Sequence, residues 1–356
     1  MPGPPDGEQL LALGHKLGEI NFEVTPTEET DMIRRAMVLS LLTAAVLCTS
    51  ARAQEDPAKS YPNKPIRVIV GYAAGGANDL VARVFGPKLA EGLGQPVIVE
   101  NKTGAAGMIS VEYVTRAKPD GYTLLFAASS MFTSNPVMFK KVPYTLSDVV
   151  PISTVVTFPF FVMVSASQPI QSIKELVGHL KAKPEGANAS GAAGIHQLGF
   201  ELFKSQTGTR GQYIPYKSTT QSINAVIASE VLMTIADAGA ASGALRGGRV
   251  RGLAVTSPTR LASYPDVPTV AELGFPGLEM GSWMGLVAPA GTPMPIVKKL
   301  QEEVNRIIKM PEFRERMSVL QVNPEGNTSE QFTAMVSSDL ARWRAVAKAS
   351  NIQPTD

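Results

Sequence analysis

The chain has 356 residues, of which 44% are hydrophobic and 18% are charged, and its formal net charge is +2. This composition is typical of a globular chain that buries one or two cores. The basic residues form no long run and only two Trp and eight Tyr are present, so we expect no nucleic-acid partner. Cys48 is the single cysteine, which excludes an internal disulfide and a multi-cysteine metal site.

The first methionine is a poor candidate for the natural start. Residues 1–31 are rich in Pro, Gly and Glu, and they precede a second methionine, Met32. From there Arg34 and Arg35 form a positive segment and residues 36–48 form an apolar one, which is the pattern of a secretory signal peptide. We therefore interpret residues 1–31 as an artefact of start assignment.

A cleavage signal follows the apolar segment. Ala51 and Ala53 flank Arg52 in the small-x-small pattern, so we predict a signal peptide over residues 32–53 and a mature, periplasmic chain from Gln54. The apolar segment is too short to anchor the protein stably in a bilayer. Cleavage as a lipoprotein at Cys48 is the weaker alternative, because the bulky Leu47 precedes it.

The most informative stretch of the mature chain is a strand, a glycine loop and a helix. Residues 68–70 are apolar, Gly75 and Gly76 allow positive φ, and Asn78 or Asp79 is expected to cap the helix that follows. Its expected apolar face holds Leu80, Val81, Val84, Phe85 and Leu89, with Gly92 and Gly94 at its end. The N-terminus of such a helix favours binding of an anion. Glycines also commonly join strands to helices in α/β proteins for structural reasons alone.

Two further strands extend this pattern. Residues 97–99 form an apolar run, a second glycine loop lies at residues 104–107, and residues 122–126 form a third apolar run. The β-α-β-α-β order predicts a parallel sheet whose carboxyl edge carries the ligand. Ser129 and Ser130 fall at that edge, where ligand contact and a solvated helix cap are equal alternatives.

The middle of the chain contains a second set of strands, a small-residue loop and helices. Residues 159–164 read as a strand, Ser172 is expected to cap a helix, and the small-residue loop 189–194 precedes another apolar helical face. Further strands are expected at residues 213–216, 231–235, 253–256 and 286–288. A long helix should then run until Pro311, and Thr328 with Gln331 predicts a capping box for the last helix.

The mature chain has few side chains that are suited to catalysis. We expect His179 to be solvated and His196 to be mainly packed, with ligand contact the less favoured alternative. No nucleophile elbow, P-loop, paired-histidine zinc motif or complete dinucleotide fingerprint is present. Asp79, Asp120 and Asp237 lie nearest the predicted loops, but their spacing does not pair them as an acid and a base. We expect ligand capture without an enzymatic reaction, a cofactor or a metal.

Short motifs follow one another along the whole mature chain. They are Tyr61-Pro62-x-Lys64-Pro65-Ile66, Gly75-Gly76-x-x-Asp79-x-x-Ala82-Arg83, Gly94-Gln95-Pro96-Val97-x-Val99-Glu100-Asn101, Pro119-Asp120-Gly121-Tyr122-Thr123-Leu124-Leu125, Pro215-Tyr216-Lys217, Leu253-Ala254-Val255-Thr256-Ser257, Val267-Pro268-Thr269-Val270-Ala271-Glu272 and Ala288-Pro289-Ala290-Gly291-Thr292-Pro293. Each is short, but their order along the chain makes the set specific. Together they resemble the extracytoplasmic solute receptors of tripartite tricarboxylate transport systems, the Bug-type receptors.

The resemblance implies an α/β fold of the type II periplasmic binding class, a Venus flytrap with two lobes. Each lobe would be a mainly parallel sheet flanked by helices. Lobe 1 would comprise residues 54–158 and 280–356, and lobe 2 residues 159–279. The ligand would be a small organic carboxylate, delivered by a monomeric receptor to the integral-membrane permease of a tripartite transporter.

The resemblance also implies which loops hold the ligand. The Gly75-Gly76 loop and the loop around Ser190 would grip a carboxylate, partly through backbone amides and bridging water. Asp237 would receive a ligand hydroxyl or ammonium group, or would only cap a helix. The full set of expected ligand-binding residues is Tyr72, Gly75, Gly76, Asn78, Asp79, Ser129, Ser130, Ser190, Ala193, Gly194 and Asp237.

The second loop departs from the family pattern. Ala193 replaces a glycine, Gly194 a hydroxyl residue and Gln197 a histidine, while Ser218 replaces a glycine and Leu232 an aspartate. One hydroxyl donor is thereby lost, which suggests a less polar or aromatic carboxylate. Two rival functions remain at this stage. One is an exported hydrolase or lyase that uses Asp79 or Asp237, and the other is a ligand-sensing partner of a membrane signalling protein.

Overall fold

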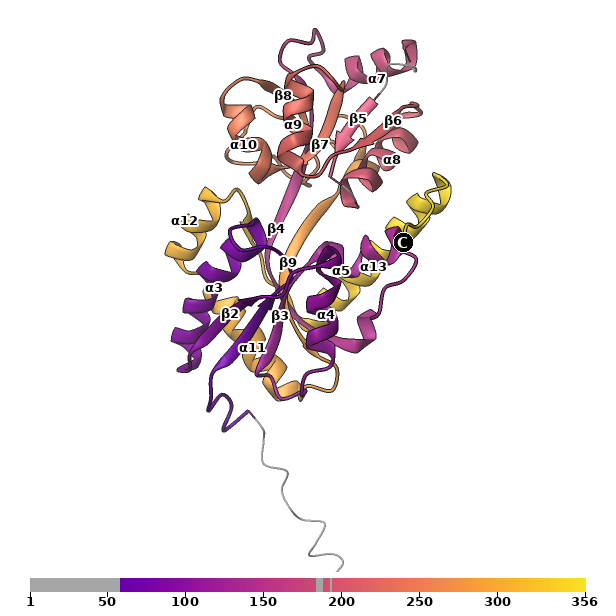
Figure 1. Ribbon diagram of the computed structural model, residues 1–356. Coiled ribbons are helices and arrows are strands. Elements are labelled where there is room, and N and C mark those ends of the chain that lie inside the picture. The colour runs from indigo at the N-terminus through magenta and orange to yellow at the C-terminus, as the bar shows by residue number, and fades with distance from the viewer. Residues whose placement is uncertain (1–57, 184–187, 193) are drawn as a thin grey trace, which may run out of the picture. The chain divides into compact units, whose positions relative to one another are not determined.

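The computed structural model describes residues 58–183, 188–192 and 194–356 (Figure 1). The predicted signal peptide, the segment 1–31 and Ala193 lie outside the described residues, and their interpretation stays a prediction. Among the helices that are described, none is long and apolar enough to cross a membrane.

The first lobe begins with the predicted β-α-β-α-β unit. It comprises β1 (Ile66–Val70), α3 (Ala77–Leu93), β2 (Val97–Asn101), the 3-10 turn η1 (Ala105–Gly107), α4 (Met108–Thr115) and β3 (Thr123–Ala128). Strand β1 pairs in parallel with β2 and β3, so Val68 lies between Val99 and Leu124. The parallel order predicted for these three strands is therefore confirmed. The short helices α5 (Ser129–Phe132), α6 (Asn135–Met138) and η2 (Leu146–Asp148) follow.

Two long strands, β4 (Val149–Ser165) and β9 (Gly281–Pro289), run between the lobes and pair antiparallel. The sequence pattern located only the second half of β4. In the first half, register shifts occur between Pro151 and Ser153 and between Thr154 and Val156. Such irregularities break the alternation of polar and apolar residues from which a strand is predicted.

The second lobe contains the elements between these strands. They are α7 (Ile173–Ala182), β5 (Asn188–Gly191), α8 (Ile195–Thr207), β6 (Gln212–Pro215), α9 (Thr219–Ile227), β7 (Met233–Asp237), α10 (Ala238–Arg246), β8 (Val250–Val255) and η4 (Pro276–Leu278). Strand β5 is parallel to β6 and β7, whereas β7 and β8 are antiparallel to β4. The strand order is β2-β1-β3-β9-β4-β7-β5-β6, and β4 also pairs with β8 and β10.

The chain returns to the first lobe through β9 and ends in helices. These elements are α11 (Met294–Ile307), α12 (Pro311–Val319), β10 (Asn323–Pro324) and α13 (Ser329–Ala349). Pro311 separates α11 from α12, and the capping box of Thr328 and Gln331 is present as predicted. Ser172 likewise caps α7.

Each lobe buries apolar residues on both faces of its part of the sheet. In the first lobe Phe85 and Phe126 pack with the helices α11 and α12, and in the second Phe160 packs with α7 and α8. The two-lobed α/β fold is thus confirmed, with a mixed sheet. Helix α13 serves both cores, because Phe332 packs in the first lobe and Trp343 in the second.

One predicted core residue is wrong. Leu80 was placed on the apolar face of α3, but 41% of its surface is exposed. The buried stripe of α3 contains Val81, Phe85 and Leu89, with Asn78 one turn before Val81 and Ala82. Because successive helical residues are rotated by about 100°, Leu80 lies beside this stripe and not on it.

A buried threonine ties the second lobe to both crossing strands. The Thr256 hydroxyl accepts a hydrogen bond from the Phe160 amide (2.9 Å) and donates one to the Met280 carbonyl (2.7 Å). Phe160 belongs to β4 and Met280 directly precedes β9, so one side chain joins the end of β8 to both strands. Its removal would leave a buried donor and a buried acceptor without that partner.

We expect Thr256→Val, which keeps the shape of the side chain, to lower the free energy of unfolding by about 1–3 kcal/mol. Urea denaturation measures this change. Thr259→Val is the matched control, since Thr259 is exposed and its hydroxyl has no hydrogen bond within the described residues. Equal stability of the two variants would contradict the role given to Thr256.

Candidate functional site

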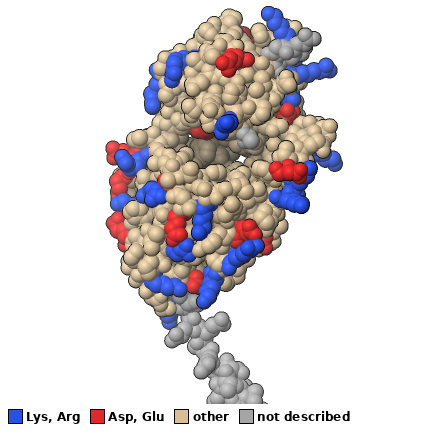
Figure 2. All heavy atoms as spheres, in the orientation of Figure 1, with Lys and Arg blue, Asp and Glu red and all other residues tan. Residues whose placement is uncertain are grey.

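The loops after β1, β2 and β3 lie at the same edge of the sheet, because the three strands are parallel. In the first loop Gly75 has φ +80° and is exposed, as expected for a glycine that the turn requires. Gly76 has φ −73° and is the N-cap of α3, so the prediction of positive φ holds for Gly75 only. Figure 2 shows the surface hollowed between the two lobes.

The predicted capping role of Asn78 or Asp79 is wrong, because the N-cap of α3 is Gly76, two residues before Asn78 and three before Asp79. The Asp79 carboxylate instead accepts hydrogen bonds from the Gly75 amide (2.9 Å) and from Asn101 Nδ2 (2.8 Å). It also forms an ion pair with Arg83 (2.9 Å), and only 2% of its side chain is exposed. Asp79 therefore holds the glycine loop in place.

These contacts set the charge state of Asp79. Burial pushes the pKa of its carboxyl upward, but the hydrogen bonds from Arg83, Gly75 and Asn101 outweigh it and hold the pKa below its ordinary value. The carboxylate is therefore ionised at neutral pH, and its charge is balanced by Arg83. An anion at the first turn of α3 would not meet an unpaired negative charge there.

Asn78 is the least satisfied polar residue of this region. It lies in the first turn of α3 with 5% of its surface exposed. Neither its amide nitrogen nor its side-chain oxygen has a hydrogen-bond partner within the described protein. A buried amide of this kind costs free energy unless a ligand or a water molecule satisfies it.

Tyr72 and Ser130 come together from the first and third loops. Their hydroxyl oxygens are 2.7 Å apart, and burial raises the pKa of Tyr72, opposed by the hydrogen bond with Ser130. Ser129 turns away, because its hydroxyl lies 2.5 Å from that of Ser282 in β9 and only 5% of its surface is exposed. Neither serine is the solvated cap that was one alternative, since α5 has Ala128 as its N-cap.

The loop after β2, at residues 104–107, was missed as part of this edge. Ala105 and Ala106 have φ of 46° and 52°, a left-handed conformation that costs a residue with a side chain about 1–3 kcal/mol. Asn135 Nδ2 donates to the Ala106 carbonyl (3.0 Å) and so helps to hold the loop. The glycines at 104 and 107 marked the turn in the sequence, but nothing there predicted left-handed alanines between them.

In the second lobe the predicted loop 189–194 is partly strand, because β5 extends to Gly191. Ser190 lies inside the lobe with 1% of its surface exposed, and its hydroxyl accepts from that of Ser222 (2.8 Å). Gly194 is the N-cap of α8 with φ +75°. A Cβ atom built on Gly194 would lie 3.3 Å from Ser134 Oγ, so this loop reaches the first lobe.

Asp237 ends β7 and caps α10, since its carboxylate accepts from the Ala240 amide (2.9 Å). The capping alternative is thus confirmed, and ligand contact by Asp237 stays a prediction. His196 is buried in the second lobe, with its ring edge-to-face against Phe160 at 5.6 Å between centroids. Its Nε2 lies 3.4 Å from the Thr219 hydroxyl.

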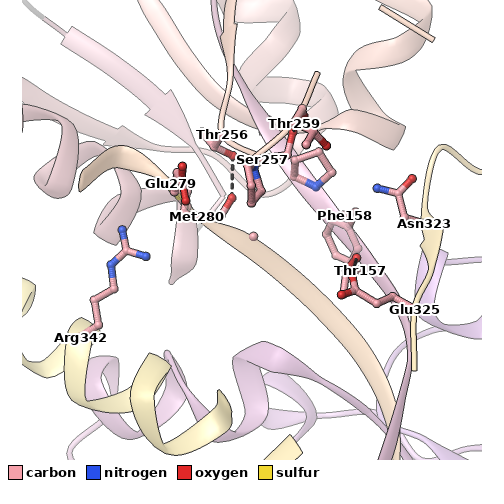
Figure 3. A pocket seen from close by; sticks show the side chains of 13 residues that line it. Thr157, Phe158, Thr256, Ser257, Thr259, Glu279, Met280, Asn323, Glu325 and Arg342 are labelled. Atoms are coloured by element: carbon pink, nitrogen blue, oxygen red, sulfur yellow. Dashed lines mark hydrogen bonds between the residues drawn. The ribbon is translucent and has the colours of Figure 1, made fainter. Parts of the chain in front are cut away.

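Another cavity, of about 490 Å³, lies beside the crossing strands (Figure 3). None of the predicted ligand-binding residues lines it. Arg342 at one end donates to the Gly277 carbonyl (3.0 Å), and burial lowers the pKa of its guanidinium against the opposing charges of Asp339 and Glu279. Among the described residues, no group of three or more His, Cys, Asp or Glu side chains could hold a metal ion.

The variant Asp79→Asn tests whether the Asp79 carboxylate stabilises the glycine loop. The variant should lose about 1–3 kcal/mol of unfolding free energy at pH 7, because charged hydrogen bonds to Gly75, Asn101 and Arg83 are weakened. A carboxyl with a lowered folded-state pKa stabilises the protein above its unfolded value of about 3.9, and this contribution disappears as the pH falls through the folded pKa.

Denaturation curves from pH 7 down to about pH 3 measure this difference. We expect the gap between wild type and Asp79→Asn to shrink toward the acid end. A gap that is constant across this range would mean that the charge of Asp79 does not support the loop.

The chain is similar to known receptors over most of its length. The family model described as "Tripartite tricarboxylate transporter family receptor" matches residues 81–352. The structure of the periplasmic binding protein BugD is 31% identical, covers 83% of this chain and 100% of its own, and superposes with a TM-score of 0.68.

Two similar structures from Rhodopseudomonas palustris contain ligands. Rpa4515 with adipate is 28% identical, with a TM-score of 0.72 and coverage of 83% of this chain and 100% of its own. MatC with bound malate is 27% identical, with a TM-score of 0.68 and coverage of 80% and 99%. With the family model matched over residues 81–352, this chain belongs to the tripartite tricarboxylate transporter family of receptors and is of the Bug type.

Proposed function

We propose that this receptor captures an organic carboxylate in the periplasm, between its two lobes, and delivers it to the permease of a tripartite transporter. The observation that carries the proposal is the first turn of α3. There a glycine loop meets backbone N–H groups without a side-chain cap and an Asn78 amide that has no partner among the described residues. Similar receptors are seen with malate and adipate, both dicarboxylates.

The electrostatics of the first lobe favour an anion. The first N–H groups of a helix have no partner within it, and the helix dipole places partial positive charge there. The acid nearest to them, Asp79, is neutralised by Arg83 and by the loop amide that it accepts. Tyr72 and Ser130 add neutral hydroxyl groups at the same edge.

The second lobe would complete the site through its backbone. Ser190 is occupied within the lobe, so the contact is more readily made by the backbone at the start of α8, near Gly194. Gly194 brings no hydroxyl where the family usually has one, and Ser134 of the first lobe faces it. We propose that this difference favours a less polar or aromatic carboxylate over a simple hydroxylated one.

Ligand binding without turnover is supported by the state of the two candidate catalytic acids. The Asp79 carboxylate accepts a hydrogen bond from the glycine loop, and the Asp237 carboxylate caps α10. Because both are engaged by the protein, neither is placed to act as a general base. A sensory role would use the same ligand site and differ only in the membrane partner. The same proposal includes three further points. The lobes are divided at residues 158/159 and 279/280, the receptor is a monomer, and a signal peptide at residues 32–53 directs its export.

A thermal-shift screen of mono-, di- and tricarboxylates, including adipate, malate and an aromatic carboxylate such as benzoate, tests the proposal. Binding to the folded state at 100 times Kd should add about 2.7 kcal/mol of stability and so raise Tm. Amines and neutral sugars serve as controls. The proposal fails if no carboxylate raises Tm, or if a hit is converted to product.

Asn78→Leu separates binding from stability. Removal of a buried amide without a partner should leave stability unchanged or raise it by about 1 kcal/mol, whereas affinity for the carboxylate identified in the screen should fall about tenfold. Urea denaturation and calorimetric titration measure the two quantities. Lower stability with unchanged affinity would show that Asn78 has a packing role only.

A further inference from the structure

The N-terminus of α10 in the second lobe lies against the C-terminus of α12 in the first. Leu320 is the C-cap of α12, and Gly239 is the second residue of α10. A Cβ atom built on Gly239 would lie 3.2 Å from the Leu320 carbonyl oxygen, closer than the 3.4–4 Å of an ordinary contact. The two helix ends can approach this closely because residue 239 has no side chain.

The backbone gives no other reason for a glycine at this position. Gly239 is not among the residues with positive φ, and it lies within a regular helix. Alanine is the better helix former at such a site. The neighbouring carbonyl is therefore the structural feature that a side chain at residue 239 would disturb.

The two helix ends carry opposite partial charges, and the Asp237 carboxylate caps the first turn of α10. The last carbonyls of α12 carry partial negative charge and the first amides of α10 carry partial positive charge. The segment from α12 to β10 faces the second lobe a second time, across a cavity of about 260 Å³ whose other wall is formed by residues 261–263.

One further contact between the lobes also involves a glycine. Gly194 of the second lobe faces Ser134 of the first, and a Cβ atom there would also lie within 3.4 Å of its neighbour. The two contacts come from different helices of the second lobe, α8 and α10. At both positions, a glycine of the second lobe lies so close to an atom of the first lobe that a side chain would have little room.

We propose that Gly239 is a positioning residue for ligand capture, because its missing side chain lets α10 approach Leu320 and so allows the lobes to close. A methyl group at this position would hold the second lobe away from the first and weaken its share of the ligand contacts. This inference rests on the proposed function only for the identity of the ligand. The effect on lobe separation stands without a ligand.

Gly239→Ala tests the inference, with Gly243→Ala as the matched control. Both changes place an alanine in α10, but a Cβ atom on Gly243 would meet nothing within 4 Å. Both variants should therefore fold, with Tm unchanged or raised, because alanine favours the helix. A Cβ atom on Gly239 would also lie 3.5 Å from the Asp237 carboxylate, so a difference in binding alone reports either neighbour, whereas a difference in lobe separation reports the contact with Leu320.

Lobe separation is measured by electron–electron distance spectroscopy. Spin labels are placed at Lys174→Cys in α7 and Lys298→Cys in α11, both exposed, with Cys48 changed to Ser. We expect the distance distribution of Gly239→Ala to shift to longer values without ligand, and that of Gly243→Ala to match the wild type. Identical distributions for all three proteins would overturn the inference.

Calorimetric titration with adipate gives the second measurement. Gly239→Ala should bind about tenfold more weakly than the wild type, and Gly243→Ala within about twofold of it. If the wild type binds adipate and Gly239→Ala binds equally well, the inference fails while the proposed function stands. If the wild type binds no carboxylate but Gly239→Ala still separates the lobes, the proposed function fails and the inference stands.

Discussion

The antiparallel pairing of β4 with β9 is the constraint on which the rest of the structure depends. Both strands pass from one lobe to the other, so their hydrogen bonds join the two halves of the molecule. Strand β4 pairs with β9 and β10 in the first lobe and with β7 and β8 in the second. The loops that approach each other across the lobes are placed by how far these two strands bend and twist.

Further contacts limit that bending. The Thr256 hydroxyl joins the end of β8 to β4 and to the residue before β9, and α13 packs with Phe332 in one core and with Trp343 in the other. The lobes are thus linked by two strands, a buried hydroxyl and a shared helix. Closure then proceeds by small rotations about these links, as in hinge motions generally, and close contacts such as Gly239 with Leu320 decide where it stops.

Polar groups in the candidate site fall into two kinds. Asp79, Ser129, Ser190 and Asp237 are each engaged by the protein itself, and they shape loops, helix ends and strand edges. Within the part of the chain that the structure describes, the first backbone amides of α3 have no side-chain cap and the amide of Asn78 has no hydrogen-bond partner. This division favours binding by groups that are held in position before the ligand arrives, which reduces the ordering cost of binding.

Much of the fold could be predicted from the sequence, because many of its strands and helices are marked by patterns of neighbouring residues. The apolar runs and glycine loops located β1, β2 and β3 and their parallel order, and cap residues located α7 and α13. The first half of β4 could not be predicted, since its register shifts remove the alternation that marks a strand. The role of Asp79 was misjudged for a related reason, because its partner Asn101 becomes a neighbour only when β2 lies beside β1.

The sequence by itself determined the two α/β units, the glycine loops at helix starts and the family of receptors to which the chain belongs. These features depend on residues close together in the chain, or on motifs recognisable one by one. Only the tertiary structure decided which polar groups remain unpaired and which glycines face the opposite lobe. Those properties depend on contacts between distant segments, such as Gly239 with Leu320 and Gly194 with Ser134, for which no local pattern exists.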